Sequence, residues 1–173
     1  MCIERMINRM ISVSEYHTEY DKVEQVSYVH PDEALNCPFC ACAELIRKGW
    51  RRRKLFILIG TFIVLMIRRV KCKKCRRIHH VLPSTIVPYK RYDAETIENI
   101  IEGNSDETCC EESAINRIKA WWTELCIYIL MIAPVIMEKR QVQVKPESKL
   151  TEIVRILANA HLWPGTRSVL VPG

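Results

Sequence analysis

The 173-residue chain lacks the features of several protein classes. It has only five glycines, no Ser/Gly/Pro-rich stretch and no internal repeat, which excludes a collagen-like chain or a flexible linker protein. Its first ten residues, MCIERMINRM, contain no apolar signal-peptide region. The two apolar runs, 55–67 and 125–137, have thirteen residues each, fewer than the ~20 that a membrane-spanning helix needs. We therefore expect a cytoplasmic protein without a membrane partner.

Acidic residues are absent from one long segment. Residues 45–92 hold fifteen basic side chains and no acidic one. By contrast, residues 93–116 hold eight acidic side chains and no basic one. A block of one charge repels itself unless it meets a polyanion, so this pattern predicts a nucleic-acid partner. A solvated face of a basic protein is the alternative.

Cysteine, in contrast, is abundant: there are nine, four of them in the pairs Cys37-x-x-Cys40 and Cys72-x-x-Cys75. In a reducing cytoplasm, such spacing indicates metal ligands or redox groups. Four thiolates form the tetrahedral set that Zn²⁺ prefers in a structural site. The 31 residues between the pairs exceed the usual ~15–20, which a long hairpin arm would explain. The sequence thus predicts a structural Zn²⁺ that stabilises this segment.

Redox chemistry at the first cysteine pair is the alternative to metal binding. Cys37-Pro-Phe-Cys40, followed by residues 43–46, resembles a glutaredoxin active site in which a thiolate acts as nucleophile. Against this hypothesis, no βαβ pattern precedes the motif, no Gly-Gly pair follows Val87-Pro88, and the second cysteine pair would have no role.

The remaining five cysteines and a histidine pair are not expected to be metal ligands. Cys2, Cys42, Cys109, Cys110 and Cys126 are expected to be small, semi-buried residues. His79-His80 could ligate a metal, but four cysteines are sufficient. We expect the two histidines to form a basic or phosphate-facing pair on a strand.

The patterns predict an α+β protein, with a small antiparallel β zinc ribbon followed by a helical, helix-turn-helix-like domain. Its divisions are a polar N-terminal arm, a zinc ribbon with a basic β-hairpin, a helix-turn-helix-like segment, and C-terminal helices with a tail: 1–34, 35–92, 93–125 and 126–173. The hairpin strands 55–59 and 62–67 would be joined by Gly60-Thr61 as a two-residue type II′ turn. A single buried helix over 54–69 is the alternative.

Helical periodicity begins after residue 93. One face carries Ile97, Ile100 and Ile101, and Gly103-Asn104 is a stop signal. A second helix is predicted to start at Ser113 as N-cap, with an inward stripe and an interruption or end at a proline: Ile115, Ile118, Trp122, Leu125 and Pro134. A third helix is expected over 149–160, and an extended tail from Trp163 to Gly173.

Two sets of residues are candidates for DNA contact. Basic side chains near the cysteine pairs would bind phosphates: Arg51, Arg52, Arg53, Lys54, Arg68, Arg69, Lys71, Lys73, Lys74, Arg76 and Arg77. The first turns of the second helix would read bases: Ser113, Asn116, Arg117 and Lys119. An ordinary helical hairpin is the alternative, and the acidic residues at 106, 107, 111 and 112 count against close DNA approach.

These motifs together carry a resemblance. Cys37-Pro-Phe-Cys40, Arg47-Lys-Gly49 and residues 67–75 resemble the zinc ribbon at the front of insertion-sequence transposases. Residues 79–92 and the helix from Ser113 are similar to a family of short bacterial proteins of unknown function, which itself resembles a transposase's DNA-binding half. Transposases continue into a catalytic domain with three carboxylates, but only 51 residues follow Trp122. No enzymatic activity is therefore expected.

The sequence favours a zinc-dependent protein that binds double-stranded DNA, is derived from a transposase and takes no small-molecule substrate. A homodimer is compatible with this hypothesis. A zinc-ribbon module that docks an acidic protein partner remains an alternative. The glutaredoxin-like oxidoreductase using Cys37 and Cys40 remains a second alternative.

Overall fold

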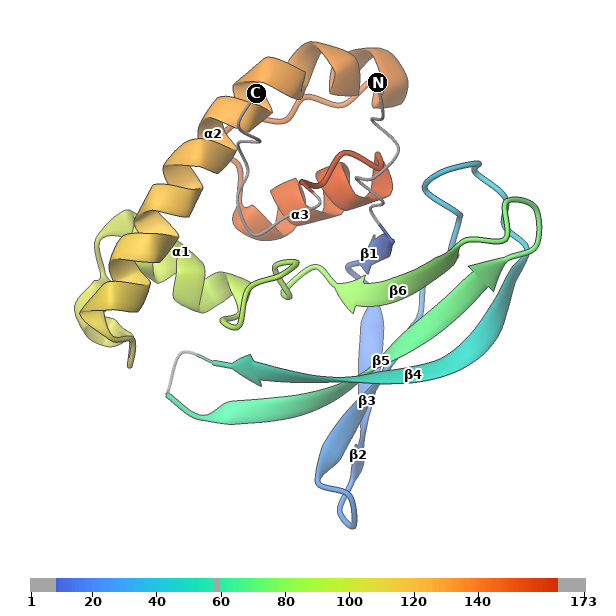
Figure 1. Cartoon of the computed structure of the whole chain (residues 1–173), viewed down its shortest axis with the longest axis horizontal. Helices are drawn as coiled ribbons and strands as arrows, with labels where there is room; N and C mark the ends of the chain where they lie inside the picture. The colour runs from blue at the N-terminus through green and yellow to red at the C-terminus, as the bar shows by residue number, and fades with distance from the viewer. Residues whose placement is uncertain (1–8, 58–59, 165–173) are drawn as a thin grey trace.

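The computed structural model describes residues 9–57 and 60–164, and in them a curled six-stranded sheet is followed by helices (Figure 1). The predicted α+β class is confirmed at this level. The strands are β1 (Met10–Val13), β2 (Tyr16–Asp21), β3 (Val26–Pro31), β4 (Leu45–Phe56), β5 (Phe62–Cys72) and β6 (Ile78–Pro83). The helices are α1 (Ala94–Glu102), the 3₁₀ turn η2 (Ser105–Glu107), α2 (Glu112–Arg140) and α3 (Leu150–Asn159).

Strand β5 lies at the centre of the sheet. Along one edge it pairs antiparallel with β4 over nearly its whole length. Along the other edge it pairs with β3 near residues 65–66 and with β6 near residues 69–71. Strand β1 extends the sheet parallel to β6, and β2 pairs antiparallel with β3. One long strand thus serves three neighbours, and the sheet curls around it.

The β4–β5 hairpin confirms the predicted hairpin and excludes the single buried helix. Its turn differs from the prediction, because Ile57 and Thr61 close a longer loop with an N–H···O bond of 3.0 Å. The predicted strand to residue 59 ends at Phe56, and residues 58–59 lie outside the described residues. Gly60 adopts φ +78°, and a Cβ there would lie 2.7 Å from the Cys109 side chain. The loop therefore requires glycine both for its backbone conformation and for its contact.

The stretch expected to be a polar arm contributes three strands to the sheet. All four residues of β1 are buried, and β1 packs under α3. The side chain of Asn159 bonds both backbone groups of Ser12, accepting from its N–H at 2.9 Å and donating to its carbonyl at 2.8 Å. A strand of four buried residues has no alternation of apolar and polar positions, so the sequence pattern did not predict β1.

Helix α1 ends where the sequence predicts. The Asp93 side chain accepts from the Thr96 N–H at 3.0 Å, and Gly103 closes the helix with φ +93°. Helix α2, however, begins at Glu112 with Glu111 at the N-cap. Ser113 therefore lies inside the first turn and is not the cap residue.

Pro134 was predicted to interrupt or end the helix, and the structure excludes the second outcome, because Pro134 lies inside α2. The helix continues to Arg140 and changes direction near its C-terminal end (Figure 1). Proline removes the hydrogen bond to the carbonyl four residues earlier, which belongs to Leu130. Leu130 is 65% exposed, so water can satisfy that carbonyl and the helix bends instead of breaking.

Helix α2 is also longer than the apolar run that it contains. Among the described residues, α2 is the one helix that is long and apolar enough to cross a membrane, and the segment that meets this criterion is Glu112–Glu138. Buried core helices of soluble proteins meet the same criterion, although only 22% of the segment Glu112–Glu138 is buried in this protein. The apolar run 125–137 is thus only part of a longer helix. The expectation that this run is too short for a membrane-spanning helix therefore does not hold for α2.

The main core lies between the sheet and the helices. It joins sheet residues such as Leu65 and Ile67 to helix residues such as Ile97, Leu125 and Leu157. Trp163 belongs to this core with 4% exposure, so the chain is not an extended tail at that point. Residues 165–173 of the predicted tail lie outside the described residues.

Candidate metal centre and basic surface

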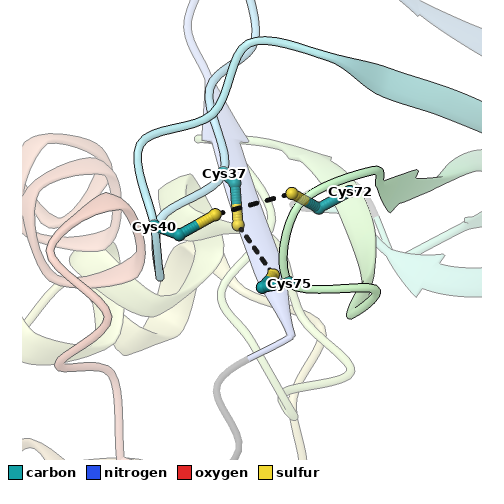
Figure 2. A group of neighbouring side chains, drawn as sticks. All are labelled: Cys37, Cys40, Cys72 and Cys75. Atoms are coloured by element: carbon teal, nitrogen blue, oxygen red, sulfur yellow. Dashed lines mark hydrogen bonds between the residues drawn. The ribbon is translucent and has the colours of Figure 1, made fainter.

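The four paired cysteines converge on one point (Figure 2). Their sulfur atoms all lie within 4.8 Å of one another, with 3.6 Å between Cys37 and Cys75 and 3.5 Å between Cys40 and Cys72. In a tetrahedral thiolate site with metal–sulfur bonds of about 2.3 Å, the sulfurs lie about 3.8 Å apart. All four thiols are free. The cluster could therefore hold a metal ion without rearrangement.

The two cysteine loops have the same backbone conformation. The Cys37 N–H donates to the Cys42 carbonyl, and the Cys72 N–H donates to the Arg77 carbonyl, both at 2.9 Å. The residue after each second cysteine has a positive φ, +57° at Ala41 and +60° at Arg76. Each loop thus curls so that both of its sulfurs point to the same side, as a shared metal requires.

The β4–β5 hairpin brings these loops together, as the spacing predicts. Leu45 at the start of β4 pairs with Cys72 at the end of β5. The Lys73 N–H donates to the Glu44 carbonyl at 3.0 Å, and its ammonium lies 2.7 Å from the Glu44 carboxylate. The 31 intervening residues run out along one strand and back along the other.

The thiols differ in acidity. Burial raises the pKa of Cys37 to about 12, although N–H groups of Cys40 and Phe39 oppose this effect. Burial also acts on Cys72, but hydrogen bonds from the Cys75 backbone and neighbouring thiols outweigh it and lower the pKa to about 6. A cation among the four sulfurs would offset the cost of ionising Cys37.

His79 contacts the cluster rather than a phosphate, so the expected phosphate-facing role is wrong for it. Its side chain is fully buried on β6, and its Nε2 lies 3.3 Å from the Cys37 sulfur. Burial and nearby cationic groups lower its pKa to about 4, so the ring is neutral near pH 7. A neutral ring can donate one N–H to the Cys37 thiolate and thereby stabilise it.

We predict that His79→Phe lowers metal affinity about 10- to 100-fold, because the Cys37 thiolate loses its donor while the cavity stays filled. Competition with a chromophoric chelator measures this loss. His17→Phe, at an exposed site on β2, is the matched control and should retain the parent affinity. Equal affinity in both variants would show that His79 serves packing alone.

The predicted phosphate-binding residues lie on β4, β5 and the second cysteine loop, and neither strand carries a carboxylate. Six of them are exposed: Arg51, Arg52, Lys54, Lys73, Lys74 and Arg76. The other five are half-buried: Arg53, Arg68, Arg69, Lys71 and Arg77. Six of the predicted residues are thus accessible to a phosphate, whereas the other five are partly covered by the protein.

Several cations already contact the protein. The Arg53 guanidinium donates to the carbonyls of Val87 and Lys90 at 3.0 and 2.8 Å. Arg77 lies 3.4 Å from the centre of the Phe39 ring. These contacts join residues far apart in the sequence, so charge counting alone could not have found them.

A basic hollow of about 430 Å³ lies beside β4, and sequence reasoning missed several of its residues. Arg9, His80 and Arg91 line it together with Arg51 and Arg53. Arg91 falls within the acid-free block and could have been suspected. Arg9 carried no sequence signal, because β1 was not expected beside β6.

The predicted base-reading residues occupy the first turns of α2 and are all exposed: Ser113, Asn116, Arg117 and Lys119. Ile118 faces the core as expected, but the more deeply buried tryptophan is Trp121 rather than Trp122. Residues 103–111, including η2, separate α1 from α2, whereas a helix-turn-helix has a turn of about 3–4 residues. A helix-turn-helix is therefore not confirmed.

Comparison with known proteins identifies one region. No match to a curated protein or to a solved structure was found. Residues 37–120 match a family described as domain of unknown function (DUF6431). The match begins at the first cysteine of the metal centre and ends within α2. The region that is similar to this family thus contains the four-cysteine cluster, the basic strands and the first turns of α2.

Proposed function

We propose that this is a zinc-dependent DNA-binding protein. The observation that carries the proposal is the position of a four-thiol cluster at the base of two long strands that hold many cations and no carboxylate. The cluster would fix the strands, and the strands would contact phosphates. The likeness of these motifs to the DNA-binding half of transposases supports the same function.

Zinc is the metal that best fits the four thiols. Four sulfur ligands at tetrahedral spacing are typical of structural Zn²⁺ sites, which leave no position open for a substrate. Cys37 and Cys72 are buried while Cys40 and Cys75 are partly exposed, which suits an ion fixed in the fold. Such a zinc ribbon supports binding, not catalysis, and the free thiols suit a reducing compartment.

Double-stranded DNA fits the basic surface. Strand β4 pairs only with β5 among the described strands, so its exposed cations Arg51, Arg52 and Lys54 can lie along a duplex backbone. Guanidinium groups bind phosphate oxygens well. Arg117, a base-reading candidate on α2, lines a hollow with Arg91 and the hairpin loop residues Ile57 and Gly60. The start of α2 and the basic hairpin could therefore contact one duplex together.

The glutaredoxin-like alternative has less support. A redox nucleophile needs an accessible thiolate with a lowered pKa. Cys37 is 1% exposed, and burial raises the pKa of its thiol to about 12. In the other alternative, the basic face of the zinc-ribbon module would dock an acidic protein partner. The exposed cations on β4 that suit DNA suit this partner as well, so only a binding experiment separates the two.

Binding to a labelled duplex tests the proposal. The zinc-loaded protein should bind mixed-sequence duplexes at ~50 mM salt, where phosphate contacts are strong. The double variant Arg52→Gln/Lys74→Gln should weaken binding on the order of 10- to 50-fold on every sequence. Lys145→Gln removes one exposed charge from the segment between α2 and α3, outside the basic strands, and should retain the parent affinity. Fluorescence anisotropy measures all three, and the absence of duplex binding at this salt would favour a protein partner.

A further inference from the structure

Two adjoining hollows form what we call the arginine cleft. They share Arg9, Arg51 and His80. The first, of about 430 Å³, adds Arg53 and Arg91, and the second, of about 410 Å³, adds Arg69. Strand β1 supplies one wall, β4 and β5 supply another, and the turn before α1 closes the side. Six arginines, Arg52 of the first hollow included, therefore surround one space.

The positive charge in this cleft is not neutralised by the residues that line it. No carboxylate is among the described residues of either hollow. The Arg53 guanidinium is largely withdrawn from water, and it donates to two neutral carbonyls. The Arg69 Nε is buried without a hydrogen-bond partner. Withdrawn charges are normally paired, so the lining of the cleft suits an anion.

The donors that face the cleft are guanidinium groups. Two lysines contribute to its walls, but their ammonium groups lie against aromatic rings. The Lys54 ammonium is 3.5 Å from the Phe62 ring centre, and the Lys90 ammonium is 4.2 Å from that of Trp121. Arginine offers paired N–H donors that match phosphate oxygens. Tyr89 and Leu82 add an apolar wall beside these donors.

We propose that the arginine cleft binds the terminal phosphate monoester of a nucleotide. A volume of several hundred Å³ suits one nucleotide unit, and a terminal phosphate carries more negative charge than a bridging phosphate within a strand. The phosphate belongs either to the 5′ end of a DNA strand or to a free mononucleotide. The first source rests on the proposed function, whereas the second does not.

His80 provides a local reporter of occupancy. Burial, followed by the charges of Arg51, Arg69 and Arg9, lowers its pKa to about 4. An anion in the cleft would offset these charges, so it favours the protonated ring and raises the pKa. The ring signals of His80 in an NMR titration therefore report binding at this place.

The first arm of the test uses thymidine 5′-monophosphate, with thymidine as the matched ligand without phosphate. The zinc-loaded full chain should bind the monophosphate with one saturable site and shift the His80 signals, and thymidine should do neither. Arg91→Gln or Arg9→Gln should weaken binding roughly tenfold each, with unchanged metal content and circular dichroism. Lys145→Gln should bind as the parent does. Absence of saturable binding, or equal binding of thymidine, overturns the proposal.

The second arm identifies the source with two duplexes that differ in a 5′-phosphate or a 5′-hydroxyl. Tighter binding of the phosphorylated duplex, lost in Arg91→Gln, assigns the cleft to DNA ends. Equal binding of both duplexes together with monophosphate binding assigns it to a free nucleotide. Binding of both duplexes without monophosphate binding rejects the cleft but keeps the proposed function. Monophosphate binding without any duplex binding keeps the cleft and rejects the DNA-binding function.

Discussion

Cys72→Ser is expected to abolish metal binding and to unfold the sheet around the cluster. The serine hydroxyl does not replace a thiolate ligand, and Cys72 both closes β5 and supplies one of four sulfurs. Zinc bound by thiolates contributes apparent free energies of about 10–16 kcal/mol to folding in small domains. This exceeds the whole stability of many domains, about 5–15 kcal/mol. Elemental analysis of zinc per chain and circular dichroism during heating measure the two effects.

Cys42→Ser is the matched control for this experiment. Cys42 follows Cys40 by two residues but lies outside the group of four sulfurs. It should retain one zinc per chain and the parent melting curve. If the parent protein instead contains no metal and Cys37 and Cys40 form a reversible disulfide, the zinc ribbon is rejected and the thiol oxidoreductase becomes the leading hypothesis.

The affinity for duplex DNA is expected to fall about 10³-fold between 50 and 200 mM salt. Six of the predicted phosphate-binding residues are exposed. If each neutralises one phosphate, the logarithm of the affinity falls with the logarithm of salt at a slope of about −5.4, since each contact contributes about −0.9. A fourfold rise in salt then produces the expected loss. Fluorescence anisotropy at four or five salt concentrations gives the slope.

Removing one exposed cation tests whether the slope counts these contacts. Arg52→Gln should make the slope shallower by about one unit. Lys145→Gln, which removes a charge elsewhere on the surface, should leave the slope unchanged. An affinity that does not change with salt would mean that the basic strands do not bind phosphates.

The four-cysteine cluster could be predicted from the sequence because the geometry of each cysteine pair is local. Each C-x-x-C pair fixes two sulfurs within one turn, and the hairpin between the pairs follows from strand residues interrupted by a glycine. Helix α1 could be predicted equally well, since Gly103 is a stop signal in the sequence and the helix ends there in the structure. In each case a few neighbouring residues determine the structure.

The features that the sequence did not predict depend on distant contacts. Strand β1 is held by pairing with β6 and by packing against α3. His79 contacts the cysteine cluster through Cys37, which lies 42 residues away in the sequence. Helix α2 passes Pro134 because the surrounding surface is open to water, which is a property of the assembled fold. The arginine cleft requires Arg9 and Arg91 on one side of the sheet. None of these long-range contacts produces a periodic pattern in the sequence.

The bonds between Asn159 and Ser12 link residues 147 positions apart. On a ribosome, the side chain that satisfies the backbone of Ser12 is synthesised 147 residues after Ser12 itself. Until then, the N–H and carbonyl of Ser12 have to remain hydrated or bind another partner. Completion of the sheet edge therefore follows the synthesis of both cysteine loops and of the hairpin between them, which are available to metal before Asn159 is made.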